Sequence, residues 1–188
     1  MKVNIAVLVS GRGSNFEALA LAAQRDDYPA RIALLVSDNP AAGALRAAER
    51  MKIESKIVDC GGSKGGMTAR SSGEIRDLCV ERRVELVCLA GFMRIVKGPL
   101  MEEYSGRMMN IHPALLPSFK GLDAQKQAFD YGVRVSGCTV HFVDAGIDTG
   151  PIIMQRVVPV LQGDTHETLS QRILAEEHAA YPEAVRLG

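Results

Sequence analysis

The stretch VNIAVLVSGRGSNFEALALAAQR, residues 3–25, decides the fold. It begins with a β-rich apolar run interrupted only by Asn4, turns through two glycines and continues with apolar residues at helical spacing. An apolar run without strict alternation is typical of a strand buried on both faces, as in a parallel sheet. The stretch therefore predicts the strand–turn–helix unit that begins a doubly wound α/β domain.

Working outward, strands and helices alternate along the chain. Further strands are predicted at 31–37, 53–59, 85–91 and 108–112, and helices at 41–51, 67–83, 122–131 and 166–181. The segments 135–144 and 151–160 flank a DTGP turn, which predicts an antiparallel pair. Asp164 or Thr165 is expected to cap the last helix. We expect a single α/β domain over residues 1–188, with a doubly wound, mostly parallel sheet and an antiparallel edge hairpin.

Composition narrows the function classes. Of 188 residues, 47% are hydrophobic, and 22 basic residues balance 22 acidic ones. This balance provides no net field to attract nucleic acid or an anionic membrane. No apolar run is long enough for a spanning helix, and the start does not read as a signal peptide, so we expect a cytoplasmic protein. The four cysteines and four histidines show no metal-ligand spacing, so we expect free thiols and no metal.

The glycine turn SGRGSN at residues 10–15 follows a strand and opens a helix. Glycines let the backbone turn sharply, and amides at a helix N-terminus attract anions. The turn therefore predicts a phosphate site, with an ordinary capped turn as the alternative. The candidate residues are Arg12, Gly13, Ser14 and Asn15.

A dinucleotide site is disfavoured at this turn. The dinucleotide fingerprint needs a third glycine, and Phe16 stands in that position. A monophosphate therefore fits better than NAD. Asp38, at the end of the second predicted strand, keeps a weak NAD alternative open.

A second candidate site begins in RMMNIHPALLP, residues 107–117. Asn110 and His112 are two residues apart on a predicted strand, so their side chains face the same side. A carboxamide can donate to an oxyanion, and an imidazole can donate or move a proton. A carboxylate would raise the pKa of the histidine, and Asp144 or Asp148 could supply it, with Asp148 in a sharp turn. The alternative is a plain strand end and an ordinary turn.

Several segments together resemble a known family. The segments are SGRGSNFEAL, LAGFMRIV, RMMNIHPALLPSFKGL, GCTVHFVDAGIDTGPIIMQ and EEHAAYP, in this order along nearly the whole chain. They resemble the phosphoribosylglycinamide formyltransferases, folate-dependent enzymes of purine biosynthesis. The resemblance implies a Rossmann-like formyltransferase fold and transfer of a formyl group from 10-formyltetrahydrofolate to the amine of glycinamide ribonucleotide.

The resemblance also implies roles for individual residues. Asn110 and His112 would stabilise the oxyanion and move protons, while Asp148 keeps His112 charged and aligned. Glu177 would bind the ribose hydroxyls of the substrate, whose phosphate the turn at 12–15 would hold; the alternative for Glu177 is an exposed helical carboxylate. The folate contacts would be Arg70, Met93, Arg94, Ile95, Val96, Asn110, Asp144 and Asp148, and Arg70 could otherwise be a solvated helix residue. His141 is expected to be a structural hydrogen-bonding residue.

Two departures concern substrate contacts: Asp123 stands where relatives commonly carry His, and Leu174 where they can be polar. A formyltetrahydrofolate deformylase is the nearest alternative, but it would bring a regulatory domain before Lys2. A methionyl-tRNA formyltransferase would need a basic C-terminal domain. A non-catalytic nucleotide sensor would not need the Asn–His–Asp set. We expect a monomer or homodimer with small-molecule partners only, and a phosphate turn that opens on the same sheet edge as Asn110.

Overall fold

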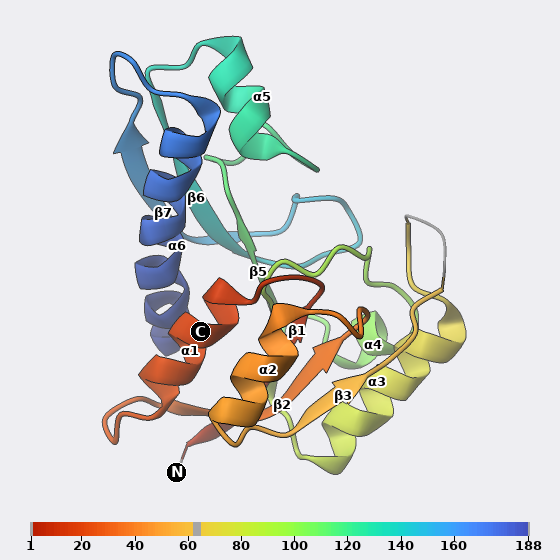
Figure 1. Cartoon of the computed structure of the whole chain (residues 1–188). Coiled ribbons are helices and arrows are strands. Elements are labelled where there is room, and N and C mark those ends of the chain that lie inside the picture. The colour runs from red at the N-terminus through yellow and green to blue at the C-terminus, as the bar shows by residue number, and fades with distance from the viewer. Residues whose placement is uncertain (1, 62–64, 188) are drawn as a thin grey trace. The chain divides into compact units, whose positions relative to one another are not determined.

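The computed structural model describes residues 2–61 and 65–187. The chain divides into two compact units, Met1–Met109 and Asn110–Gly188 (Figure 1). The division falls within one strand, β5 (Met108–His112). That the chain forms a single domain stays a prediction.

The first unit contains a parallel sheet in the order β3-β2-β1-β4. The strands are β1 (Val3–Val9), β2 (Ala30–Ser37), β3 (Ser55–Ile57) and β4 (Leu86–Leu89). Residues 5–9 of β1 are fully buried, which explains its nearly unbroken apolar sequence. The predicted parallel strands are confirmed, although β3 is shorter than its apolar pattern indicates.

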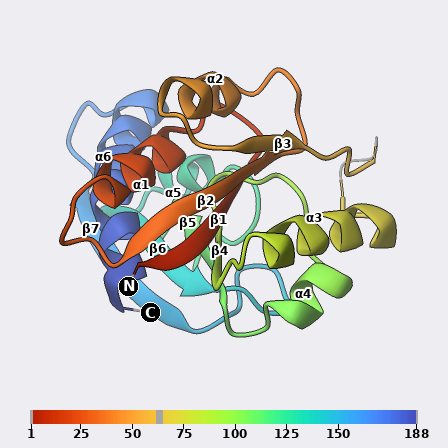
Figure 2. The same ribbon diagram turned by 90° about the horizontal axis from the view of Figure 1, so that it is seen from below.

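Helices cover both faces of this sheet. On one face, α1 (Ser14–Ala23) packs against β2 and against α2 (Gly43–Arg50), while α3 (Ala69–Glu81) packs with α4 (Pro99–Glu103) on the other (Figure 2). The doubly wound arrangement is therefore confirmed. The sequence analysis missed α4, which starts at Pro99 and is too short to show helical periodicity.

The second unit contains the order β5-β6-β7, and β6 (Val135–Phe142) pairs antiparallel with β7 (Ile152–Pro159). The predicted hairpin is confirmed. The helices of the second unit are α5 (Ala124–Tyr131) and α6 (His166–Leu187), and α6 packs along β6 and β7 (Figure 1). Contrary to prediction, α6 continues beyond residue 181 through Pro182, because buried Ala184 and Val185 hold its last turn against the core.

Two expectations from composition can be compared with the structure. All four cysteines are buried free thiols, as expected. Among the described residues, no helix has both the length and the apolar character needed to cross a membrane.

Candidate active site

Three polar side chains converge in the second unit. Asn110 and His112 come from β5, and Asp148 comes from the loop that joins β6 to β7. His112 Nδ1 lies 3.3 Å from Asp148 Oδ2, and Asn110 Nδ2 lies 3.5 Å from Asp148 Oδ1. The His112 side chain is 5% exposed and that of Asp148 12% exposed. The set that the sequence predicts is therefore brought together.

His112 has hydrogen-bond acceptors at both ring nitrogens. Its Nε2 lies 2.8 Å from the carbonyl oxygen of Phe119, and its Nδ1 faces the Asp148 carboxylate. Only the protonated ring can donate to both acceptors. Burial nevertheless lowers the pKa of His112, and this outweighs the opposite effects of the Phe119 carbonyl and Asp148. Asp148 raises the pKa of His112 as predicted, but burial lowers this pKa overall.

Asp148 is held as a carboxylate. Burial, the largest influence, raises its pKa, but the amide of Gly121 and the nearby imidazoles together outweigh burial, so the pKa is lowered overall. The Gly121 amide donates to Oδ2 over 2.8 Å. Asp148 has a backbone φ of 50°, a left-handed conformation uncommon outside glycine. The turn therefore aims this carboxylate by backbone geometry.

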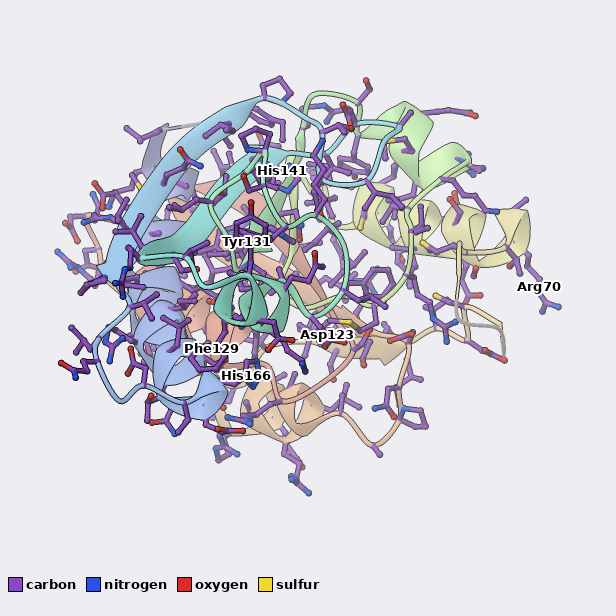
Figure 3. The ribbon with its side chains drawn as sticks, turned by 90° about the horizontal axis from the view of Figure 1, so that it is seen from above. Arg70, Asp123, Phe129, Tyr131, His141 and His166 are labelled. Atoms are coloured by element: carbon purple, nitrogen blue, oxygen red, sulfur yellow. The ribbon has the colours of Figure 1, made fainter. Side chains whose placement is uncertain are left out.

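The loop 113–123 provides backbone groups to this site. Besides the Phe119 carbonyl and the Gly121 amide, it contributes the Phe119 ring, which packs edge-on against Tyr131 of α5 with centroids 5.8 Å apart. Tyr131 is labelled in Figure 3. The sequence analysis did not predict these contacts, since backbone groups of a loop have no residue-type signature.

Asp144, the other candidate partner of His112, is hydrogen-bonded within its own loop. Its Oδ1 accepts hydrogen bonds from the Thr149 hydroxyl (2.6 Å) and the Gly146 amide (3.0 Å). The Thr149 hydrogen bond is the main reason that its pKa is lowered. The choice left open by the sequence therefore falls on Asp148 as the partner of His112.

Two glycines fix the shape of this loop. A Cβ at Gly146 would lie 2.0 Å from Thr149 Oγ1, and one at Gly150 would lie 1.9 Å from the carbonyl oxygen of Phe142. Both distances are far below contact: a side chain at Gly150 would force the backbone to move, and one at Gly146 would displace the Thr149 side chain. The loop that presents Asp148 is therefore closely packed on itself.

The glycine turn in the first unit has the shape that the sequence predicts. Gly13 has a φ of 84° and directly precedes α1. A Cβ at this position would lie 2.5 Å from the Cβ of Ala44, so both the backbone angle and the packing require glycine. Asn15 is buried, while Arg12 is exposed. The turn thus leads directly into the positive end of a helix dipole.

Two backbone groups of the segment 93–96 are hydrogen-bonded within the first unit. The Met93 amide donates to Ser10 Oγ over 2.8 Å, and the Ile95 carbonyl accepts from the amide of Met67 over 3.1 Å. Met93 is 60% exposed, whereas Val96 is buried. The expected folate contacts through backbone groups stay a prediction.

An ion pair that the sequence analysis did not foresee joins Arg94 to Asp38. Arg94 Nε donates to Asp38 Oδ2 over 2.7 Å, and this hydrogen bond is the main reason that the pKa of Arg94 is raised. The Asp38 side chain is 5% exposed. Because Oδ2 is engaged by Arg94 and the side chain is buried, Asp38 is poorly placed to bind the ribose of a dinucleotide, which further disfavours the NAD alternative.

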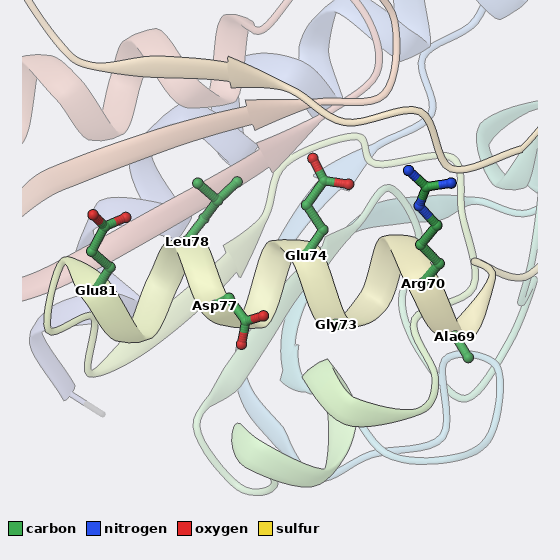
Figure 4. Close-up of a pocket in the computed structure, with 7 residues that line it drawn as sticks. All are labelled: Ala69, Arg70, Gly73, Glu74, Asp77, Leu78 and Glu81. Atoms are coloured by element: carbon green, nitrogen blue, oxygen red, sulfur yellow. The ribbon is translucent and has the colours of Figure 1, made fainter.

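Arg70 is exposed near the start of α3 and points away from the protein (Figure 3). It borders an open depression of about 640 Å³ along this helix (Figure 4). The depression is lined by Ala69, Arg70, Gly73, Glu74, Asp77, Leu78 and Glu81. Three of these residues are acidic, which does not favour an anionic ligand. A contact between Arg70 and a folate tail stays a prediction.

Glu177 is buried in α6 and only 5% exposed. The alternative of an exposed helical carboxylate is therefore wrong. Burial chiefly raises the pKa of the Cys138 thiol to about 12, and the negative charge of Glu177 adds to this rise. Glu177 therefore faces the core side of α6, near β6.

Comparison with known proteins identifies the family. The chain matches the formyl transferase family over residues 3–185. The chain belongs to the formyl transferase family. It is 44% identical to the phosphoribosylglycinamide formyltransferase of Bacillus subtilis, over 96% of this chain and 92% of that protein. It is 46% identical to the trifunctional purine biosynthetic protein adenosine-3 of Gallus gallus, over 99% of this chain and 18% of that protein. The chain thus spans less than a fifth of the length of the trifunctional relatives.

Solved structures of the family agree over the whole chain. The crystal structure of glycinamide ribonucleotide transformylase 1 from Symbiobacterium toebii matches with a TM-score of 0.92 at 45% identity, covering 99% of this chain and 87% of that one. The phosphoribosylglycinamide formyltransferase from Anaplasma phagocytophilum matches with a TM-score of 0.90 at 43% identity, covering 100% and 87%. The family and the α/β fold predicted from sequence motifs are confirmed. Within residues 2–61 and 65–187, no cluster of three or more His, Cys, Asp or Glu could hold a metal ion.

Proposed function

We propose that the protein transfers the formyl group of 10-formyltetrahydrofolate to the amine of glycinamide ribonucleotide in purine biosynthesis. The observation that carries the proposal is the convergence of Asn110, His112 and Asp148, with the imidazole and the carboxylate 3.3 Å apart. The formyl transferase family, and relatives named phosphoribosylglycinamide formyltransferase, support the same reaction.

The reaction needs an acid and a charge partner. The substrate amine attacks the formyl carbon, a carbon–nitrogen bond forms and the carbonyl oxygen becomes an oxyanion. Protonated His112 stabilises this oxygen, and Asp148 stabilises the imidazolium. The bond from the formyl carbon to the folate nitrogen then breaks, and the proton lost by the amine is taken up by the leaving nitrogen. A pKa of His112 lowered by burial suits a group that both gives and takes this proton.

The two substrates would be bound by groups outside this set. The turn residues Arg12, Gly13, Ser14 and Asn15 would hold the substrate phosphate at the start of α1. Buried Glu177 would accept hydrogen bonds from the ribose hydroxyls. Arg94, aligned by Asp38, would contact the folate together with its neighbours in segment 93–96.

One assay separates the transferase from the deformylase and from a non-catalytic sensor. The protein is mixed with 10-formyltetrahydrofolate, with and without glycinamide ribonucleotide. Release of tetrahydrofolate that requires the ribonucleotide is the expected result. Release without it would mean a hydrolase, and binding without turnover would mean a sensor. The variant H112A should lose at least about a hundredfold in turnover, the scale for a lost acid/base or oxyanion donor, with unchanged folding.

A further inference from the structure

His141 lies against the reacting residues and has no part in the proposed mechanism. It comes from β6, is 2% exposed, and its Nε2 lies 3.2 Å from Asn110 Nδ2 (Figure 3). Its Nε2 is also 3.6 Å from Asp148 Oδ1, too long for a good hydrogen bond. Of these two neighbours of Nε2, Asn110 is therefore the closer.

The other ring nitrogen decides which tautomer His141 adopts. Its Nδ1 lies 2.8 Å from the backbone carbonyl oxygen of Phe142. A carbonyl oxygen can only accept, so Nδ1 carries the hydrogen, and in the neutral ring Nε2 is left as an acceptor. The amide nitrogen of Asn110 can only donate, so a hydrogen bond across the 3.2 Å to Nε2 uses the lone pair of that ring nitrogen.

This tautomer of His141 dictates the orientation of the Asn110 carboxamide. An acceptor at Nε2 requires the amide nitrogen of Asn110, rather than its oxygen, to face His141. The same nitrogen also faces the Asp148 carboxylate, at 3.5 Å from Oδ1. The carboxamide oxygen makes neither of these contacts and is the atom left to meet a ligand.

We propose that His141 is a positioning residue that fixes Asn110 with its oxygen toward the attacking amine. The oxygen accepts an N–H hydrogen bond, which orients the nitrogen lone pair and strengthens as that nitrogen gains positive charge during attack. This inference rests on the proposed function.

The tautomer is tested directly by nitrogen-15 NMR of the full chain with labelled histidine, with the His141 signals assigned by their loss in H141Q. The expected result is a protonated Nδ1 and a bare Nε2 near neutral pH. A protonated Nε2 would overturn the inference, whatever the activity of the enzyme.

The link through Asn110 is tested by a double-mutant cycle with H141L, N110A and the double variant. We expect H141L to lower kcat by about tenfold or more with little change in either KM, and to have no further effect once Asn110 is alanine. H141Q, whose side-chain oxygen can replace Nε2 as the acceptor, should retain more activity than H141L. The half-buried His166 at the start of α6 provides a matched control, and H166L should behave as wild type.

The outcomes distinguish a failure of the proposed function from a failure of the role given to His141. A wild-type protein without ribonucleotide-dependent turnover contradicts the proposed function. Ribonucleotide-dependent turnover in the wild type, combined with additive losses in the cycle or an unaffected H141L, contradicts the role of His141 alone. Because H141L could fail to fold, its circular dichroism spectrum is compared with that of the wild type, and the NMR result stands without it.

Discussion

The exchange D148N removes one charge and almost no volume from the candidate active site. Asparagine tolerates a left-handed backbone, so the φ of 50° is retained without new strain. Its side-chain oxygen can still accept from the Gly121 amide. The main change is therefore the loss of the negative charge that faces His112.

The size of the effect follows from the separation of the two groups. At 3.3 Å, unit charges attract by about 5 kcal/mol at an effective dielectric constant of about 20. The asparagine dipole replaces part of this attraction, so we expect about half of it, roughly 2.5 kcal/mol, to be lost from stabilisation of the imidazolium in the transition state. That loss corresponds to a fall in kcat of roughly seventyfold.

The assay is steady-state turnover of 10-formyltetrahydrofolate and glycinamide ribonucleotide between about pH 5 and 8. Because the carboxylate raises the pKa of His112, its removal lowers that pKa further, and the limb of the pH profile that depends on protonated His112 should move to lower pH. The control is D130N, which changes an exposed aspartate paired with Lys126 on α5. A D148N enzyme with nearly normal kcat and an unmoved pH profile would refute the role given to this carboxylate.

Three further predictions concern stability and binding. G13A should lower the free energy of unfolding by about 2–4 kcal/mol, because of the left-handed φ and the clash of the new Cβ. In the same denaturant titration G11A should cost far less, because its Cβ would meet nothing within 4 Å. D38N should raise the KM for the formyl folate several-fold with little change in kcat, because Arg94 loses its charged partner. An unchanged KM would contradict a contact between Arg94 and the folate. Since burial lowers the pKa of His112, the unfolded chain binds its proton first, so stability should fall as the pH drops below about 6.5, and H112Q should show a weaker fall.

Local pattern was sufficient to predict which side chains of the candidate site lie together. Asn110 and His112 are two positions apart on a strand, and strand geometry alone places them on one side. The turn residues that follow the next strand indicated Asp148 as an aimed carboxylate. The apolar strands and the glycine turn likewise predicted the α/β fold, because their patterns report burial on both faces.

Contacts between distant positions left no local signal. Asp38 and Arg94 are 56 residues apart, and neither shows in its own neighbourhood that the other is its partner. The Phe119 carbonyl is a backbone group and would be the same with any residue at that position. The direction in which the pKa of His112 shifts depends on how deeply the ring is buried, which a sequence pattern does not measure. His141 was recognised as a hydrogen-bonding residue, but its partner required coordinates.

The glycines at 146 and 150 limit which positions of this loop can be substituted when the protein is engineered to accept other substrates. Libraries that randomise the 144–151 segment would contain many members with a displaced loop, because a Cβ at Gly150 collides with the backbone oxygen of Phe142 at the end of β6 and one at Gly146 collides with the Thr149 side chain. Directed evolution should therefore leave these two codons untouched and diversify exposed positions such as Leu122 and Ile147, where side chains can change size without displacing the backbone.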